Sequence, residues 1–104
     1  MERGEVWWAD FPKPVKRRPV LLLSRNKAIN IREFITVAEI TRSIRDIPTE
    51  VKLGTREGLP KECVVNLDVI NTIPKAILLE RITKLSVDKL HEINSALKFA
   101  CALE

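Results

Sequence analysis

The stretch Arg17-Arg18-Pro19-Val20-Leu21-Leu22-Leu23-Ser24 decides the fold, because it runs a basic cluster directly into an uninterrupted apolar segment. An apolar run of this length, with a proline at its threshold, predicts a strand that is buried on both faces. A second apolar run, residues 35–40, ends in Thr41-Arg42-Ser43. If the two strands are neighbours, a guanidinium and a hydroxyl meet at one end of a sheet. That juxtaposition would form a site for a phosphodiester.

The rest of the chain predicts further short strands and one terminal helix. Strands are expected over residues 5–11, 49–53, 63–70 and 79–85, since each is apolar or alternating and is bounded by turn residues. Residues 25–33 are expected to form a polar loop and residues 71–76 a turn.

Ser86 is a suitable N-cap for the terminal helix. Its apolar residues recur at helical spacing and would pack on the sheet: Leu90, Ile93, Leu97, Ala100 and Cys101. Strands and helices do not alternate along the chain, which argues against a parallel sheet. We therefore expect a mainly β fold with a C-terminal helix, in the form of a small, strongly curved antiparallel barrel. Residues 1–104 would form a single domain.

The charge distribution indicates an anionic partner. The chain of 104 residues has a formal net charge of +4, and four cations lie within residues 13–18 without an acid among them. Clustered cations favour nucleic acid, and the alternative is a solvated basic loop. No apolar run approaches the length of a membrane span, and the first residues lack the pattern of a secretory signal. A cytoplasmic protein with no membrane partner is expected.

Most catalytic chemistries have no support in the sequence. It contains no phosphate-binding glycine loop and only one histidine, His91, so neither a histidine-rich metal site nor a Ser-His-Asp triad is indicated. Cys63 and Cys101 match no zinc or redox spacing and are expected to be reduced and buried. We expect no metal and no cofactor.

What remains is phosphate chemistry by arginine and hydroxyl groups. A guanidinium binds phosphate oxygens with two hydrogen bonds and can stabilise charge on a pentacoordinate phosphorus. Without a metal to activate water, the nucleophile would have to come from the substrate, and RNA supplies one in its 2′-hydroxyl. If the chain is a nuclease, RNA is the favoured substrate.

Two adjacent tryptophans stand in the first expected strand. Trp7 and Trp8 should point to opposite faces of that strand. One ring would belong to the core, and the other could stack on an unpaired base. The alternative is that both rings are packed in the barrel or in an interface between two copies.

The sequence resembles the MazF/PemK/Kid family, the toxin halves of type II toxin–antitoxin pairs, in several segments that occur in the same order. The matching segments are Arg3-Gly4-Glu5-Val6-Trp7, Arg17 to Ser24, Ala38-Glu39-Ile40-Thr41, Ile47-Pro48-Thr49-Glu50-Val51, Val64 to Thr72 and Ile82-Thr83-Lys84-Leu85. The resemblance covers essentially the whole chain.

The resemblance implies an SH3-like barrel of the CcdB/PemK type, a homodimer, and a metal-independent endoribonuclease that cuts single-stranded RNA at short sequences. It implies a cognate antitoxin whose acidic segment covers the basic cleft. Arg18 and Thr41 correspond to the family's catalytic residues. The residues that would contact RNA are Lys16, Arg17, Arg42, Ser43, Asp68 and Asn71.

One segment departs from the family pattern. Only residues 12–17 separate Phe11 from Arg18, whereas many members have a longer first loop, so the cut sequence of a relative does not transfer. Two other functions stay open: a gyrase-inhibiting toxin of the same fold, and a passive RNA-binding barrel. Gyrase inhibitors of this fold typically end in Trp-Gly-Ile, which is absent here.

Overall fold

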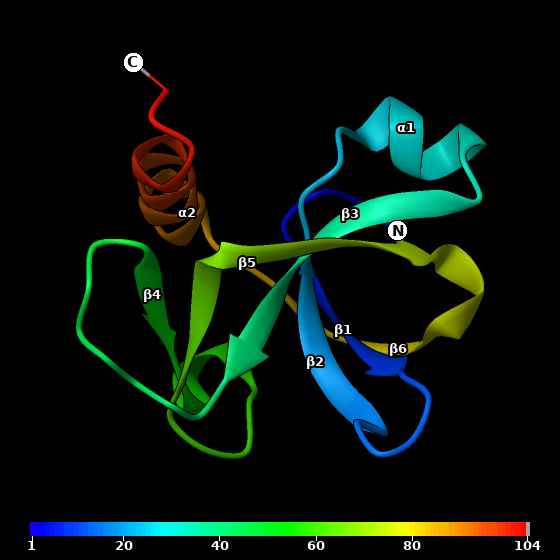
Figure 1. Cartoon of the computed structure of the whole chain (residues 1–104), viewed down its shortest axis with the longest axis horizontal. Coiled ribbons are helices and arrows are strands. Elements are labelled where there is room, and N and C mark those ends of the chain that lie inside the picture. The colour runs from blue at the N-terminus through cyan, green and yellow to red at the C-terminus, as the bar shows by residue number, and fades with distance from the viewer. Residues whose placement is uncertain (104) are drawn as a thin grey trace.

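Six antiparallel strands form one curled sheet, a half-barrel, in the computed structural model, which describes residues 1–103 (Figure 1). The strands are β1 (Glu5–Asp10), β2 (Arg17–Leu22), β3 (Phe34–Thr41), β4 (Glu50–Leu53), β5 (Cys63–Pro74) and β6 (Leu78–Lys84). The helices are α1 (Asn26–Ile31) and α2 (Val87–Ala100), and short 3₁₀ turns span Thr55–Glu57 and Lys75–Ile77. The expected curved antiparallel sheet with a C-terminal helix is confirmed.

The strand order is β4-β5-β3-β2-β1-β6, so β2 and β3 are neighbours as predicted. Val20 pairs with Glu39, and Leu22 pairs with Val37. The pairing of β3 with β5 contains an irregularity, because Glu39 pairs with Asn66 while Ala38 pairs with Ile70. Residues 67–69 of β5 are therefore extra, and a bulge of this kind bends its strand.

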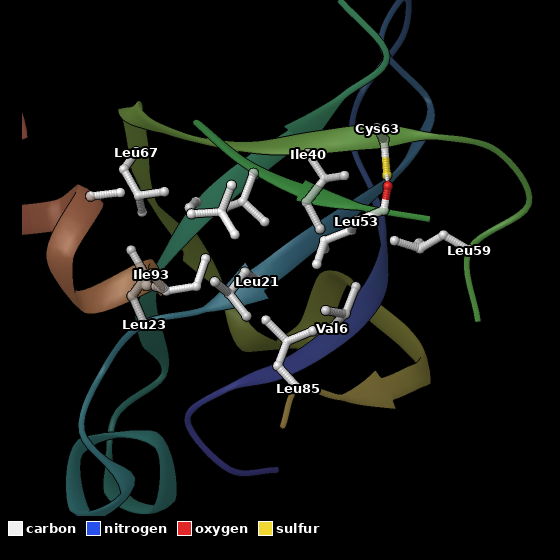
Figure 2. Close-up of a cluster of buried hydrophobic side chains, with 14 residues drawn as sticks. Val6, Leu21, Leu23, Ile40, Leu53, Leu59, Cys63, Leu67, Leu85 and Ile93 are labelled. Carbon is white, nitrogen blue, oxygen red and sulfur yellow. Dashed lines mark hydrogen bonds between the residues drawn. The ribbon is translucent and has the colours of Figure 1, made fainter. Parts of the chain in front are cut away.

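Two apolar clusters form the core, one on each face of the sheet. The first contains Leu21 and lies under α2, which contributes Ile93 and Ala96 (Figure 2). The second contains Val20 and Leu22. Because successive residues of β2 enter different clusters, this strand is buried on both faces, as its continuous apolar sequence predicts.

The terminal helix begins where the sequence predicts. The Ser86 hydroxyl accepts a hydrogen bond from the Lys89 backbone N–H at 3.1 Å, which confirms its N-cap role. The apolar face of α2 ends before Cys101, which is exposed. Of the two cysteines that were expected to be buried, Cys63 is buried and Cys101 is not. Within residues 1–103 no helix is long and apolar enough to span a membrane.

Two local predictions are wrong. Residues 25–33 contain the helix α1, which is held in place by Ile29 of the second apolar cluster. Residues 71–74 continue β5 instead of turning, because β3 extends far enough to pair with them. Pro74 is tolerated because it is the last residue of the strand, where the missing N–H costs little.

Candidate active site

The register of β2 and β3 brings the two predicted catalytic residues together. Val20 pairs with Glu39, the last pair of the β2–β3 ladder at this end, and Arg18 and Thr41 each lie two residues beyond it. Opposite residues of an antiparallel pair lie on the same face. Both residues also line one cleft of about 490 Å³ at the end of these strands. The lining residues are Trp8, Arg17, Arg18, Pro19, Ile40, Thr41, Arg42, Ser43, Leu59, Pro60, Lys61 and Cys63.

The cleft lining is cationic. It contains Arg17, Arg18, Arg42 and Lys61 and no acidic side chain. Arg17 is ion-paired with Glu80 at 3.3 Å, whereas within residues 1–103 the other three cations make no side-chain hydrogen bond or ion pair. Three unpaired cations around one cleft produce a positive potential that attracts an anion such as a phosphodiester.

Thr41 has its hydroxyl oriented by the backbone. It is partly buried, and its oxygen accepts a hydrogen bond from the Ser43 N–H at 3.2 Å. A hydroxyl has one hydrogen to donate in addition to its acceptor lone pairs. Since the acceptor side is used by Ser43, the remaining hydrogen is available to a phosphate oxygen in the cleft.

The cleft collects five of the predicted site residues: Arg17, Arg18, Thr41, Arg42 and Ser43. Lys16 is not among the lining residues. It lies in the turn between β1 and β2, in a left-handed conformation with φ of 61°, and its carbonyl accepts a hydrogen bond from the Phe11 N–H. Its side chain is exposed beside the basic cluster, so it contributes charge at the edge of the cleft.

Asp68 and Asn71, which were expected to contact base edges, also lie outside the cleft lining. Asp68 is in the bulge of β5 and accepts a hydrogen bond from the Thr49 hydroxyl at 2.6 Å. Asn71 donates a hydrogen bond to Glu39 at 2.8 Å. Each polar group thus has an intramolecular partner, and the structure does not bring either residue together with Arg18 and Thr41.

The far wall of the cleft was missed by sequence reasoning. It consists of Leu59, Pro60, Lys61 and Cys63, from the connection between β4 and β5. Gly58 allows this connection to turn back, because its φ of 87° is accessible mainly to glycine. The available signal was a lysine between a Gly-Leu-Pro turn and a strand.

Cys63 contributes no nucleophile to this wall. Burial, and to a smaller extent the charge of Glu57, raises the pKa of the Cys63 thiol. Its Sγ points towards the Leu53 carbonyl oxygen inside the first apolar cluster (Figure 2). Because the thiolate is the reactive form, a raised pKa makes this cysteine unreactive.

The two tryptophans lie on opposite faces of β1, as predicted. Trp7 packs against the second apolar cluster, and its indole N–H donates to Glu5 at 2.8 Å. Trp8 lines the cleft, with the Arg17 guanidinium 5.1 Å from its ring centroid. His91 is exposed on α2 and does not line the cleft. The chemistry of the cleft is therefore that of arginine, lysine, hydroxyl and indole groups.

Comparison with known proteins identifies a family that matches nearly the whole chain. The family model described as "PemK-like, MazF-like toxin of type II toxin-antitoxin system" matches residues 2–101. A "Probable endoribonuclease MazF2" of Mycobacterium tuberculosis is 38% identical over 99 residues, which cover 94% of this chain and 95% of that protein.

Two solved structures agree with this assignment. The Mycobacterium tuberculosis toxin MazF-mt6 superposes with a TM-score of 0.88 at 31% identity, covering 96% of this chain and 98% of that one. A mycobacterial endoribonuclease in complex with its cognate antitoxin gives a TM-score of 0.87 at 28% identity, covering 100% and 97%. The chain therefore belongs to the PemK-like, MazF-like toxins of type II toxin–antitoxin systems.

Proposed function

We propose that this toxin is an endoribonuclease that cleaves single-stranded RNA in the cytoplasm at short sequences, without a metal, and so arrests growth. Its relatives named as endoribonucleases support the ribonuclease activity. The observation that supports the mechanism is that Arg18 and Thr41 line one cationic cleft. Neither group is a strong base, so the reaction has to use a nucleophile that the substrate provides.

The proposed reaction is an internal phosphoryl transfer. The ribose 2′-oxygen forms a bond to the adjacent phosphorus while the bond from phosphorus to the 5′-oxygen breaks. The 2′-hydroxyl proton leaves to solvent, and the departing 5′-oxygen takes up a proton. The products are a 2′,3′-cyclic phosphate and a 5′-hydroxyl. No water molecule is consumed and no electron is transferred in this step.

Arg18 and Thr41 would stabilise the transition state of this transfer. The planar guanidinium of Arg18 donates two hydrogen bonds to the phosphate oxygens, whose negative charge increases in the pentacoordinate state. The Thr41 hydroxyl, oriented by the Ser43 N–H, donates a third. Arg42 and Lys61 would hold the neighbouring phosphates of the strand, so we expect a polyanion to bind more tightly than a mononucleotide.

The test is cleavage of a mixed single-stranded RNA in EDTA, followed by mapping of the fragment ends. Wild-type protein should give 5′-hydroxyl and cyclic phosphate ends. Thr41→Ala should lose roughly 10²-fold or more in rate, as loss of an oriented donor to a transition-state oxyanion does. Thr41→Ser should recover much of the rate, and Arg18→Lys should be poorly active because an ammonium lacks the planar fork.

Other outcomes distinguish the competing functions. RNA that stays intact but binds tightly would identify a passive binding protein, and inhibition in a parallel gyrase supercoiling assay would identify a gyrase inhibitor. Cleavage by Thr41→Ala at the wild-type rate would refute the assigned catalytic site while leaving the activity in place.

Two protein partners complete the proposal: a second copy of the chain and an antitoxin with an acidic segment. β4 pairs only with residues 63–66 of β5, so the outer edge of residues 67–74 has no strand beside it within residues 1–103. Val69 and Ile70 are exposed there. An open apolar edge of this kind suits pairing with another chain. Sedimentation equilibrium should give twice 11.9 kDa, and a monomeric mass at micromolar concentration would contradict the dimer.

A further inference from the structure

Arg17 differs from the other cations of the cleft because its guanidinium has two side-chain neighbours. It is ion-paired with Glu80 at 3.3 Å, and it lies over the Trp8 ring at 5.1 Å from the centroid. The other three cations of the cleft make no such contacts within the described chain. A phosphate would have to compete with Glu80 for Arg17, whereas it meets no competitor at Arg18, Arg42 or Lys61.

The sheet register explains why these three side chains meet. Trp8 of β1 pairs with Pro19 of β2 on one side and with Glu80 of β6 on the other. Residues opposite each other across antiparallel strands share a face, and so do residues two apart along one strand. Arg17 precedes Pro19 by two residues and therefore shares the face of Trp8 and Glu80. Arg18, the next residue, has the opposite orientation along the strand, and both arginines line the cleft at the end of β2.

The cleft thus has two chemically different parts. Arg18 and Thr41 present hydrogen-bond donors for a phosphodiester. Trp8, Pro19 and Arg17 present flat, weakly hydrated surfaces, and the Arg17 side chain remains 53% exposed despite its contacts. Unpaired RNA bases stack on aromatic side chains and on arginine planes. A guanidinium held against an indole offers such a plane with its orientation fixed in advance.

We propose that Trp8 and Arg17 form a stacking subsite for an unpaired RNA base next to the scissile phosphate. This rests on the proposed ribonuclease function and specifies how the substrate is held. The base lies against the exposed face of the Arg17 guanidinium, which Trp8 supports from behind. Glu80 is a positioning residue, because it fixes the guanidinium without contacting the base. Arg17, which the resemblance implied would contact RNA, is thereby assigned to a base.

The subsite also selects single-stranded RNA over duplex RNA. In a duplex each base is already stacked between its neighbours and paired with its complement. The subsite would have to break those contacts, whereas an unpaired base presents a free face. Since every base has such a face, the subsite itself contributes affinity with little sequence preference.

The test separates stacking from charge by combining protein variants with abasic sites. The probe is a labelled eight-nucleotide single strand with 2′-O-methyl riboses, which binds but cannot undergo internal attack. A single abasic site is moved along it, and dissociation constants are measured by fluorescence anisotropy. Removal of the stacked base should weaken wild-type binding about tenfold at one position. In Arg17→Lys and in Trp8→Leu, removal of the same base should weaken binding by less than about twofold. The comparison of protein variant with abasic probe is a double-mutant cycle, which measures the coupling between side chain and base.

Matched variants make the result specific. Arg42→Lys makes the same chemical change in the same cleft at a cation without an aromatic neighbour, and it should keep the full abasic penalty. Trp8→Phe retains an aromatic face and should keep most of the abasic penalty. Glu80→Gln, which loosens Arg17 without touching RNA, should give a penalty between those of wild type and Arg17→Lys.

Two results would overturn the subsite: no abasic position that weakens wild-type binding, or an abasic penalty that Arg17→Lys and Trp8→Leu leave unchanged. Because the assay measures binding to an uncleavable strand, its result does not depend on whether the protein cleaves RNA. A protein that shows the expected penalties but does not cleave unmodified RNA would keep the subsite and lose the ribonuclease proposal. A protein that cleaves RNA but shows no abasic penalties would keep the ribonuclease proposal and lose the subsite.

Discussion

Replacement of the buried Glu5 by glutamine should destabilise the fold in a pH-dependent way. The Glu5 carboxylate accepts hydrogen bonds from the Trp7 indole at 2.8 Å and from Arg81 at 3.3 Å, and the residue is 6% exposed. Burial by itself raises the pKa of Glu5, but the hydrogen bonds from Trp7, from the Glu2 backbone and from Arg81 together outweigh it. The pKa of Glu5 therefore lies below its ordinary 4.5.

The expected loss is about 1–2 kcal/mol at pH 7. Glutamine can still accept the indole hydrogen, but a charge-assisted bond of about 1.5–3 kcal/mol becomes a neutral one of about 0.5–1.5 kcal/mol. The ion pair with Arg81 contributes at most about 1 kcal/mol, because the Arg81 side chain is half exposed. Glu2→Gln is a suitable control, since its ion pair with Lys84 is exposed on both sides.

The pH dependence follows from the direction of the shift. Because the folded pKa is lowered, the charged carboxylate stabilises the fold above the unfolded pKa, and this contribution disappears as the pH falls through the folded value. Urea unfolding of wild type and Glu5→Gln at pH 7 and pH 3 should give a difference in unfolding free energy that shrinks towards zero in acid. Equal unfolding free energies at pH 7, or a difference that grows in acid, would refute the reasoning.

Two further measurements test the packing. Ile93→Ala should lower the free energy of unfolding by about 2–5 kcal/mol, because Ile93 is fully buried under α2, while Val87→Ala on the exposed side of the same helix should cost less than about 0.5 kcal/mol. In native protein a thiol reagent should modify Cys101 quickly and Cys63 only after unfolding, as counted by mass spectrometry. Two rapidly modified thiols in native protein would contradict the burial of Cys63.

Strands that are specified by their own side chains could be predicted from the sequence. β2 and β3 are apolar runs with clear ends, so the strands themselves followed from local pattern, whereas their pairing was only assumed and is established by the strand order. The helix α1 could not be predicted, because it has no side-chain cap and no charged residues suited to its ends. It is stabilised by the burial of Ala28 and Ile29, which is a tertiary effect.

For the site too, residues on regular strands could be predicted and residues on irregular backbone could not. Seven of the lining residues come from β2, β3 and the residues directly after β3, and five of these seven were among the predicted site residues. Lys61 was not, because its position depends on how residues 54–62 fold back over the end of the sheet. Asp68 was expected to contact RNA from the resemblance alone, and it lies in the bulge of β5, outside the cleft lining. Irregular backbone is set by long-range packing, which a local pattern does not contain.

The pairing of β1 with β6 has a consequence for how the protein is made. It joins Glu5–Asp10 to Leu78–Lys84, so residues 11–77 lie between the two strands. Such non-local pairing makes folding slow, and during synthesis the N-terminal part of a chain emerges first. During synthesis β1 can pair with β2 early, but it lacks β6 until residue 84 has left the ribosome. The wall that Trp8 shares with Glu80 is therefore completed later than the wall that Trp8 shares with β2.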